Sequence, residues 1–514
     1  MQKLLLFLFP WTLMANEPLR FTISPVSTDG KYRLQVEVEF DGSPKGVTFL
    51  DFQDNQFGES DQMAFVHFPE QYPGVSIRKE PDSNRLMVNH LPMKRVRVLY
   101  QILDLQDSSE LFFQYCCYKP IINKDYFHVQ TGHLLIAPEG YWDGPDDLQT
   151  IQLRWEHFPA DWVLHNSFGP DTSQLVALTN SEFSVGVLVG GDFRRFKFEV
   201  KGQPVYLLTR GEWSQFSDDT LLNLLKRTVE GHRAFWNDFS DTIYTVTFLP
   251  IQDAPWNERS RVVSVGGSGL TNSFMSFATD NPGVEFNLIR YVWVHELMHH
   301  WIGVHIQNAD EERQYWFSEG FTEYFTLKNS LRYGLINTDE FLDGLNNFAS
   351  EHYSSPLRTM PNDSMSYDHF WNGGKAWEKL PYNRGCLYAF YLDNLIRTKT
   401  KGTQNLDQLM RKILSEVRTN PNQKLDHPFF TKMLIPFAGK SSVQYFDNFI
   451  ELGKPINFTR SRLPEGLEII TKDANLHFGQ NGAVITNAEI IKNIPVFRIK
   501  SGVEKAILRA ALLK

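Results

Sequence analysis

The sequence predicts an α+β protein with a β-rich, sandwich-like N-terminal domain, a mixed central domain, a helical C-terminal segment and a small β tail. Apolar and polar residues alternate in the N-terminal part, which is typical of half-buried strands. From Ser217 onward, apolar residues recur at helical spacing. At 514 residues, 42% of them hydrophobic and 14% aromatic, the chain is long enough for about two to four domains with filled cores.

Residues 1–15 are expected to be a secretory signal. Met1-Gln2-Lys3 provides a charged start, residues 4–14 are an apolar stretch of suitable length, and Ala15 is a small residue for cleavage. A membrane anchor is the alternative, but the segment is short for a span and Pro10 interrupts it. The protein is therefore expected to be exported, periplasmic or secreted, with no stable membrane span in the mature chain.

Residues 16–205 are assigned to the β-rich domain. The clearest strand runs from Tyr32 to Phe40, where apolar and polar side chains alternate without exception. Rougher patterns predict further strands at residues 96–103, 151–155, 184–189 and 196–200. This part contains no residue set with recognisable chemistry, so its expected role is to wall one side of a cleft.

Residues 206–400 are assigned to the central domain. Ser217 and the aspartates that follow it can cap a helix whose apolar side includes Leu221, Leu225 and Val229. Strands are expected at residues 243–249 and 261–265, followed by an apolar helix at residues 286–294.

The remaining residues form two parts. Residues 401–454 are expected to be a helical segment with helices at residues 406–417, 428–437 and 441–451. Residues 455–514 are expected to be a small tail of short strands, with turns around Gly479-Gln480-Asn481-Gly482.

The strongest chemical signal is His295-Glu296-Leu297-Met298-His299. On a helix, residues four apart lie about 40° apart in rotation and one turn apart along the axis, so both imidazoles can reach one ion. A hydrolytic zinc site uses three protein ligands and one open position. Glu319, at the expected start of a second helix, is the candidate third ligand. The expected cofactor is Zn²⁺.

Four neighbouring residues receive other assignments. Glu296 is about 100° round the helix from His295, so it is the candidate general base rather than a ligand. Glu323, one turn after Glu319, is a candidate partner for the second ring nitrogen of a ligand histidine. His300 and His305 fall on other faces of the helix and are interpreted as packing or solvent-facing residues.

This pattern resembles the gluzincin zinc metallopeptidases. Ser318 to Thr322 (Ser-Glu-Gly-Phe-Thr) and Tyr382 to Gly385 (Tyr-Asn-Arg-Gly) make the glycyl aminopeptidase family the nearer relative. The aminopeptidase N and leukotriene hydrolase branch is related, but the loop between His299 and Glu319 is one residue longer here than is usual there. The resemblance implies a thermolysin-like zinc catalytic domain over residues 206–400 and aminopeptidase activity.

The resemblance also gives Tyr382 a role. In both branches a tyrosine in this context stabilises the oxyanion of the tetrahedral intermediate, an interaction that typically contributes a few kcal/mol. The alternative is an ordinary half-buried tyrosine that leads into the apolar helix at residues 387–396.

A departure concerns substrate binding. Where the aminopeptidase N branch carries a glutamate that grips the substrate amine, this chain reads Gly266-Gly267-Ser268-Gly269 without an acid. These residues are candidates for an edge strand that pairs with a peptide backbone, since glycine permits close approach. A plain glycine turn after the strand at residues 261–265 is the alternative.

The expected partner is a peptide or protein substrate, as the metal motif and the family resemblance imply. A net charge of −9 argues against nucleic acid, and the cysteines Cys116, Cys117 and Cys386 give no disulfide framework. The expected function is zinc-dependent hydrolysis of peptide bonds, as an aminopeptidase by resemblance. An endopeptidase and a non-catalytic binding or scaffold protein on the same fold are the alternatives.

Overall fold

The computed structural model describes residues 17–514, except residue 29 and residues 52–61, 81–84, 93, 105–118, 141–147, 252–255, 259–260, 459–462, 476–478, 481–482 and 485–489. The expected signal at residues 1–15, Cys116, Cys117 and the turn residues Asn481 and Gly482 therefore lie outside the described residues. Within the described part, no helix combines the length and the apolar character needed to cross a membrane.

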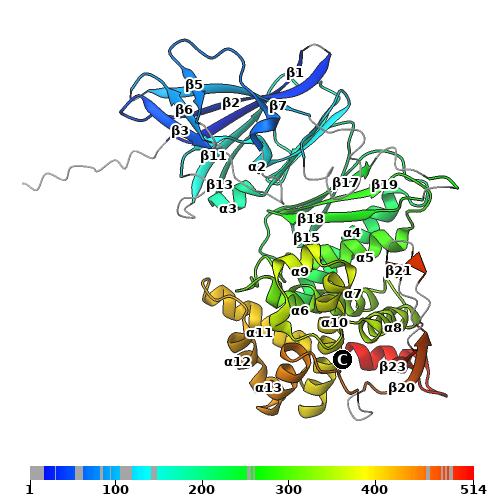
Figure 1. The fold of residues 1–514 in the computed structure, drawn as a ribbon. Helices are drawn as coiled ribbons and strands as arrows, with labels where there is room; N and C mark the ends of the chain where they lie inside the picture. The colour runs from blue at the N-terminus through cyan, green and yellow to red at the C-terminus, as the bar shows by residue number, and fades with distance from the viewer. Residues whose placement is uncertain are drawn as a thin grey trace, which may run out of the picture.

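The N-terminal domain is built from β-sheets, as the alternating sequence predicts (Figure 1). The described residues form a six-stranded sheet in the order β13-β11-β1-β2-β7-β4 and two four-stranded sheets, β10-β3-β6-β5 and β12-β14-β9-β8. Alternate residues of the six-stranded sheet are fully buried in the core, among them Phe21, Ile23, Val36, Val38 and Val98. The strands predicted from this alternation at residues 32–40, 96–103 and 151–155 are confirmed.

The elements of this domain are β1 (Leu19–Thr28), β2 (Lys31–Asp41), β3 (Val47–Asp51), η1 (Gln62–Phe65), β4 (Val66–His67), β5 (Ser76–Lys79), β6 (Leu86–Asn89), β7 (Arg95–Leu103), β8 (Ile121–Ile122), β9 (Tyr126–Gln130), α2 (Thr131–Leu134), β10 (Ala137–Pro138), β11 (Gln149–Trp155), β12 (Val163–Asn166), β13 (Ser173–Leu178), α3 (Asn180–Ser184) and β14 (Val187–Gly191).

The central domain starts from a five-stranded sheet in the order β15-β16-β17-β19-β18. Its strands are β15 (Arg194–Val200), β16 (Gln203–Thr209), β17 (Tyr244–Ile251), β18 (Val265–Leu270) and β19 (Ser273–Thr279). Neighbours β16, β17 and β19 run parallel, whereas β15 and β18 are antiparallel strands at the two edges.

The hairpin of β15 and β16 belongs to this sheet, although most of it precedes residue 205, where the sequence analysis placed the domain boundary. β16 is covered on both faces, because Val205 and Leu207 enter one apolar cluster and Tyr206 and Leu208 another. Alternation along a single strand cannot reveal which sheet that strand joins, so the sequence pattern left this pairing open.

Helices cover one face of the five-stranded sheet and extend away from it (Figure 1). The first, α4 (Asp218–Trp236), is capped by Ser217 as expected and packs Leu221 and Leu225 with Trp293 of α5 (Phe286–Met298) against the sheet. The chain continues through η2 (Glu312–Gln314), α6 (Tyr315–Ser318), α7 (Gly320–Arg332), α8 (Thr338–Ser354), η3 (Asn362–Ser364), α9 (Tyr367–Asn372) and α10 (Lys375–Lys399).

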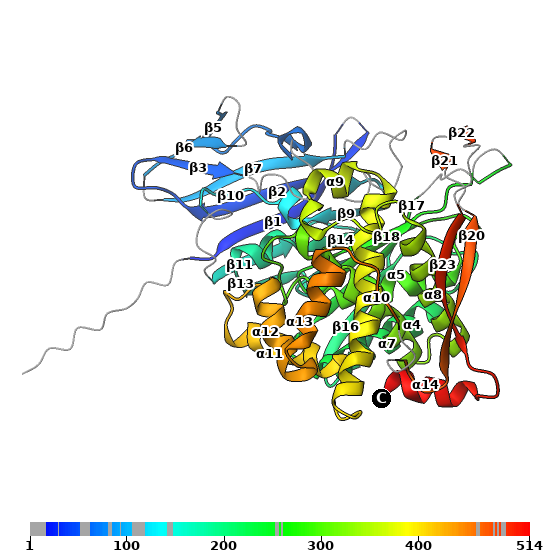
Figure 2. The same cartoon turned by 60° about the horizontal axis from the view of Figure 1, so that its bottom comes forward.

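The C-terminal segment contains the three helices that the sequence predicts, α11 (Leu406–Thr419), α12 (His427–Ala438) and α13 (Ser441–Phe446), the last continuing into a π-helical turn, η4 (Asp447–Glu451). The tail comprises β20 (Leu467–Asn475), β21 (Gly479–Gln480), β22 (Ala483–Val484), β23 (Ile490–Ile499) and α14 (Lys505–Leu513). Strand β23 lies along α8 (Figure 2), where the Asn346 side chain donates to Phe497 O at 2.9 Å and accepts from Phe497 N at 2.7 Å.

Three local expectations are corrected. The strand expected at residues 184–189 begins only at Val187, because Thr179 and Glu182 form a capping box that starts helix α3. The strand expected at residues 261–265 instead runs through the glycines as β18. The tail is not made of strands alone, since it ends in α14, which buries Leu508 and Leu512 one turn apart.

Two glycines set the crossing of α6 and α7 with α10. A Cβ atom on Gly320 would lie 2.4 Å from the Cα of Gly385, and one on Gly385 would lie 2.0 Å from the carbonyl oxygen of Trp316. Real side chains do not occupy such positions, so the two backbones approach closely only because both residues lack a Cβ. Glu319 immediately precedes one of these glycines, and Tyr382 lies three residues before the other.

A buried ion cluster fixes the other end of the same pair of helices. Lys328 of α7 is fully buried, and its Nζ lies 2.8 Å from Asp393 Oδ2 of α10 and 2.6 Å from Asp407 Oδ1 of α11. Breaking a buried pair leaves an uncompensated charge, so the three helices are held in one register.

Replacement of Gly385 by alanine is expected to lower the free energy of unfolding by about 1–3 kcal/mol, because the new methyl group meets backbone that cannot rotate away. This loss should exceed the gain of up to about 1 kcal/mol from the better helix propensity of alanine. Denaturant unfolding measures the change. Gly269→Ala is the matched control, since a Cβ there meets nothing within 4 Å. Equal stability of the two variants would contradict the close crossing.

Candidate active site

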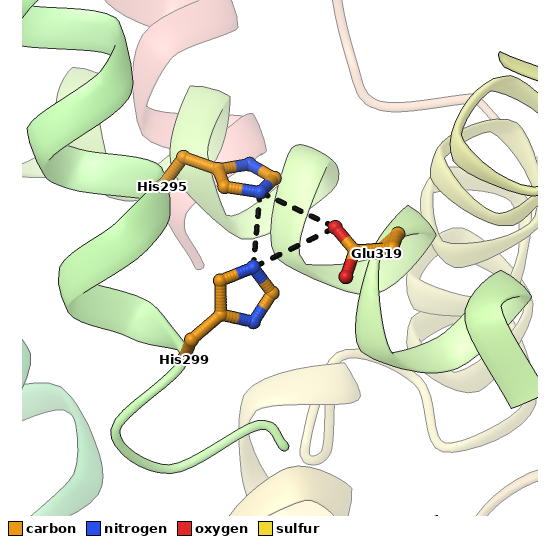
Figure 3. Close-up of side chains that lie close together, drawn as sticks. All are labelled: His295, His299 and Glu319. Atoms are coloured by element: carbon orange, nitrogen blue, oxygen red, sulfur yellow. Dashed lines mark hydrogen bonds and ion pairs between the residues drawn. The ribbon is translucent and has the colours of Figure 1, made fainter. Parts of the chain in front are cut away.

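The structure brings together the three residues that the sequence singles out as metal ligands (Figure 3). His295 lies in the last turn of α5, His299 is the residue that ends it, and Glu319 lies between α6 and α7. His295 Nε2 lies 3.0 Å from His299 Nε2, and Glu319 Oε2 lies 3.4 Å from the first nitrogen and 3.6 Å from the second. The longer loop before Glu319 therefore does not keep its carboxylate away from the histidines.

These separations fit one zinc ion. Zinc lies about 2.0–2.2 Å from nitrogen and oxygen ligands, which places two ligands of a tetrahedral site roughly 3.3–3.6 Å apart. The three donor atoms form a triangle with sides of 3.0, 3.4 and 3.6 Å. The donor set, two imidazoles and a carboxylate, is also the type found in catalytic rather than structural zinc sites.

The outer nitrogens of both histidines have partners that orient the rings. His299 Nδ1 lies 3.0 Å from the carbonyl oxygen of Ile302, which accepts a hydrogen bond from the N–H at that nitrogen and leaves Nε2 free to bind a metal. His295 Nδ1 lies 3.5 Å from Glu323 Oε2, and the hydroxyl of Tyr291 donates to the same carboxylate oxygen. Glu323 thus lies where the sequence analysis expected a partner for a ligand histidine.

Electrostatics at the site favour a bound cation. Burial alone would lower the pKa of His295, but the carboxylates of Glu323 and Glu319 outweigh it and raise that pKa well above its usual value. Burial likewise opposes charge on Glu319, yet His299 and His295 hold its pKa well below the usual range. The carboxylates therefore favour positive charge at the imidazoles, which a bound dication can supply in place of protons.

Glu296 lies next to the three donors without being one of them. Burial raises the pKa of its carboxyl group, and Glu319 and Glu323 act in the same direction, while His295 and His299 oppose the shift. A carboxylate whose pKa is raised toward neutrality is a better proton acceptor and donor at physiological pH.

Tyr382, in the second turn of α10, lies beside the same group. Its ring centroid is 6.3 Å from that of His295, and the two ring planes differ by 12°. Burial, followed by the carboxylates of Glu319, Glu296 and Glu323, raises the pKa of Tyr382 well above its usual value. The phenol therefore keeps its proton and can donate a hydrogen bond.

The glycine segment is an edge strand rather than a turn. Gly266, Gly267, Ser268 and Gly269 all lie in β18, which pairs only with β19 among the described residues. A Cβ on Gly267 would lie 2.3 Å from Met275 O and 2.5 Å from the ring of Phe274, so glycine is required for this pairing. The other edge of β18 has no strand partner in the described structure.

Sequence reasoning missed Tyr291 and the carbonyl group of Ile302. Tyr291 lies four residues before His295 on the same helix face, a spacing that could have identified it. A backbone carbonyl carries no sequence signal. His300 Nε2 lies 3.1 Å from Asp241 Oδ1 and the ring of His305 lies against that of His300, so neither joins the described metal-binding group.

The segment that contains the site matches a peptidase family. Residues 289–388, which include all three ligand candidates, Glu296 and Tyr382, match the model of the M61 glycyl aminopeptidase family. This match confirms the family resemblance for that segment. No curated protein sequence matches the chain.

A solved structure shares the fold, and others match with lower scores. An aminopeptidase N family protein from Idiomarina loihiensis matches with a TM-score of 0.70 at 16% identity, covering 88% of this chain and 79% of that chain. Native yeast LTA4 hydrolase matches with a TM-score of 0.46 at 16% identity, covering 87% and 69%. Legionella pneumophila aminopeptidase A in complex with aspartic acid matches with a TM-score of 0.46 at 13% identity, covering 94% and 56%.

Zinc binding is expected to depend on Glu323 as well as on the ligands. Glu323→Gln should lower the zinc affinity about 10–100-fold, because a neutral amide orients His295 less strongly than a carboxylate. Competition with a chromophoric chelator measures the affinity. His300→Gln is the control and should bind zinc as the unaltered protein does, whereas His299→Gln should lose the metal. Equal affinities of the Glu323 and His300 variants would count against the orienting contact.

Proposed function

We propose that this protein is an exported zinc-dependent peptidase that removes residues from the N-terminus of peptides. One observation carries the proposal: His295 Nε2, His299 Nε2 and Glu319 Oε2 lie within 3.6 Å of one another beside Glu296 and Tyr382. His295, His299 and Glu319 would hold the ion. When bound there, zinc would lower the pKa of a water molecule toward ~7 and polarise the carbonyl group of the scissile bond.

Glu296 moves the proton. Its carboxylate accepts a proton from the attacking water and delivers it to the nitrogen of the departing amine, which needs that proton to leave. Its setting raises its pKa, which favours the protonated form that the carboxyl group takes between the two transfers. Glu323 and Ile302 take no part in the transfer and hold the imidazole rings in place.

Tyr382 stabilises the negative charge that develops on the carbonyl oxygen. The neutral phenol donates a hydrogen bond, and burial beside three carboxylates keeps it neutral. Because this hydrogen-bond donor is already in position, no free energy is needed to reorient it when the negative charge develops.

β18 is the proposed docking edge for the substrate backbone. An extended peptide can add to its unpaired edge as a further strand, with the glycines permitting close approach. The assignment as an aminopeptidase is supported by the family match over residues 289–388. The absence of an acidic residue among Gly266, Gly267, Ser268 and Gly269 favours the second candidate, an endopeptidase.

Glu296→Gln is expected to lower kcat for peptide hydrolysis by about 10²–10⁴-fold, because the amide cannot carry the proton. Zinc content should remain that of the unaltered protein, since Glu296 is not one of the three grouped donors. Activity assays and metal analysis of one preparation measure both quantities. Near-normal turnover with metal bound would exclude the mechanism.

The exopeptidase assignment has its own test. Peptides that differ only in a free or an acetylated N-terminus should separate the two candidates, because an amine-dependent site fails on the blocked form. Mass spectrometry of the products is expected to show stepwise removal of single residues from the free peptide alone. Internal cleavage of both peptides at similar rates would favour the endopeptidase.

A further inference from the structure

The short helix α9 exposes two large aromatic side chains. Tyr367 is 63% exposed and Trp371 is 59% exposed, far more than the aromatic residues of the core. They lie four residues apart, on one face of the helix, and their ring centroids are 6.2 Å apart. Exposed aromatic pairs of this kind are costly to leave in water and often mark binding surfaces.

A continuous series of rings joins this pair to the active site. Trp371 contacts Phe370 edge-on at 5.0 Å between centroids. Phe370 lies 6.4 Å from Tyr382 with nearly parallel planes, and Tyr382 lies 6.3 Å from the metal ligand His295 in the same manner. The buried ring of Phe370 also packs on Tyr315, at 4.4 Å. Three successive ring contacts therefore connect Trp371 to His295.

Other contacts hold α9 in place. Ser366 caps its N-terminus, accepting from the backbone N–H of His369 at 3.2 Å. The imidazole of His369 stacks on Trp377 at 4.1 Å between centroids, with planes 4° apart, and its Nδ1 lies 2.8 Å from Ser364 O. With Phe370 buried as the anchor, Tyr367 and Trp371 are not required to fix the helix.

We propose that Tyr367 and Trp371 bind an aromatic or large apolar side chain of the peptide substrate, and so determine which peptides are cleaved efficiently. This inference rests on the proposed peptidase function. An aromatic side chain packs on exposed rings edge-on or offset, and removes their apolar surface from water. The ring-to-ring distances from Trp371 through Phe370 and Tyr382 to His295 are 5.0, 6.4 and 6.3 Å. Trp371 and His295 are therefore no farther apart than the length of about five residues of extended peptide. The recognised residue therefore lies close to the cleaved bond.

The test uses hexa-alanine peptides in which a single phenylalanine occupies each position in turn. In the unaltered protein, kcat/KM at the preferred position is expected to exceed that of hexa-alanine by at least about tenfold. In Trp371→Ala this ratio should fall about tenfold through KM, and Trp371→Phe should restore most of it. Tyr32→Ala is the matched control, since Tyr32 is 41% exposed on the distant β2 strand. A ratio that stays the same in Trp371→Ala overturns the proposal.

A binding measurement tests the role of Tyr367 and Trp371 independently of whether the protein hydrolyses peptides. The same peptides are titrated into Glu296→Gln and into Glu296→Gln with Trp371→Ala by calorimetry. A phenylalanine-dependent affinity that the second substitution lowers about tenfold supports the proposal even if the protein hydrolyses no peptide. The same affinity in both variants overturns it. Light scattering provides a further test. If the protein is a dimer that Trp371→Ala dissociates without any change in peptide selectivity, the proposal is overturned, because Tyr367 and Trp371 would then contact a second copy of the chain.

Discussion

The contact between Gly320 and Gly385 is the constraint on which the arrangement of the active site depends. Glu319 precedes the first glycine directly, and Tyr382 lies nearly one helical turn before the second. Because two backbones without Cβ atoms meet there, one helix crossing brings a proposed metal ligand and the proposed oxyanion donor to the same end of α5. The buried Lys328 cluster at the far end of α7 and α10 prevents the helices from sliding past one another.

The charged groups of the site are concentrated around two histidines. Glu296, Glu319 and Glu323 lie close to two imidazoles, and each carboxylate shifts the pKa of its neighbours. The carbonyl of Ile302 lies at the outer nitrogen of His299. The carboxylate of Glu323, which accepts from Tyr291, lies at the outer nitrogen of His295, so the inner nitrogens keep their direction. Such orienting contacts limit how far a metal-binding atom can move. A catalytic metal site needs this restriction, because the reacting groups must stay in one geometry during binding and reaction.

Two surfaces of different character border this centre. On the sheet side, β18 offers backbone hydrogen-bonding groups and almost no side chains, which suits any peptide sequence. On the helical side, α9 offers exposed aromatic rings, which suit only some side chains. General backbone recognition and selective side-chain recognition would thus come from two different elements, an edge strand of the sheet and a short helix.

The sequence by itself determined what lies within one element. The period of alternation predicted the strand from Tyr32 to Phe40, and the spacing of His295 and His299 placed two candidate ligands on one helix face, because both depend only on local backbone geometry. Relations between elements came from the tertiary structure alone: the reach of Glu319, the position of Tyr382, the pairing of β15 and β16 with the central sheet, and the rings that connect α9 to His295. These depend on how closely distant backbones can approach and which faces become covered, and no local pattern encodes either.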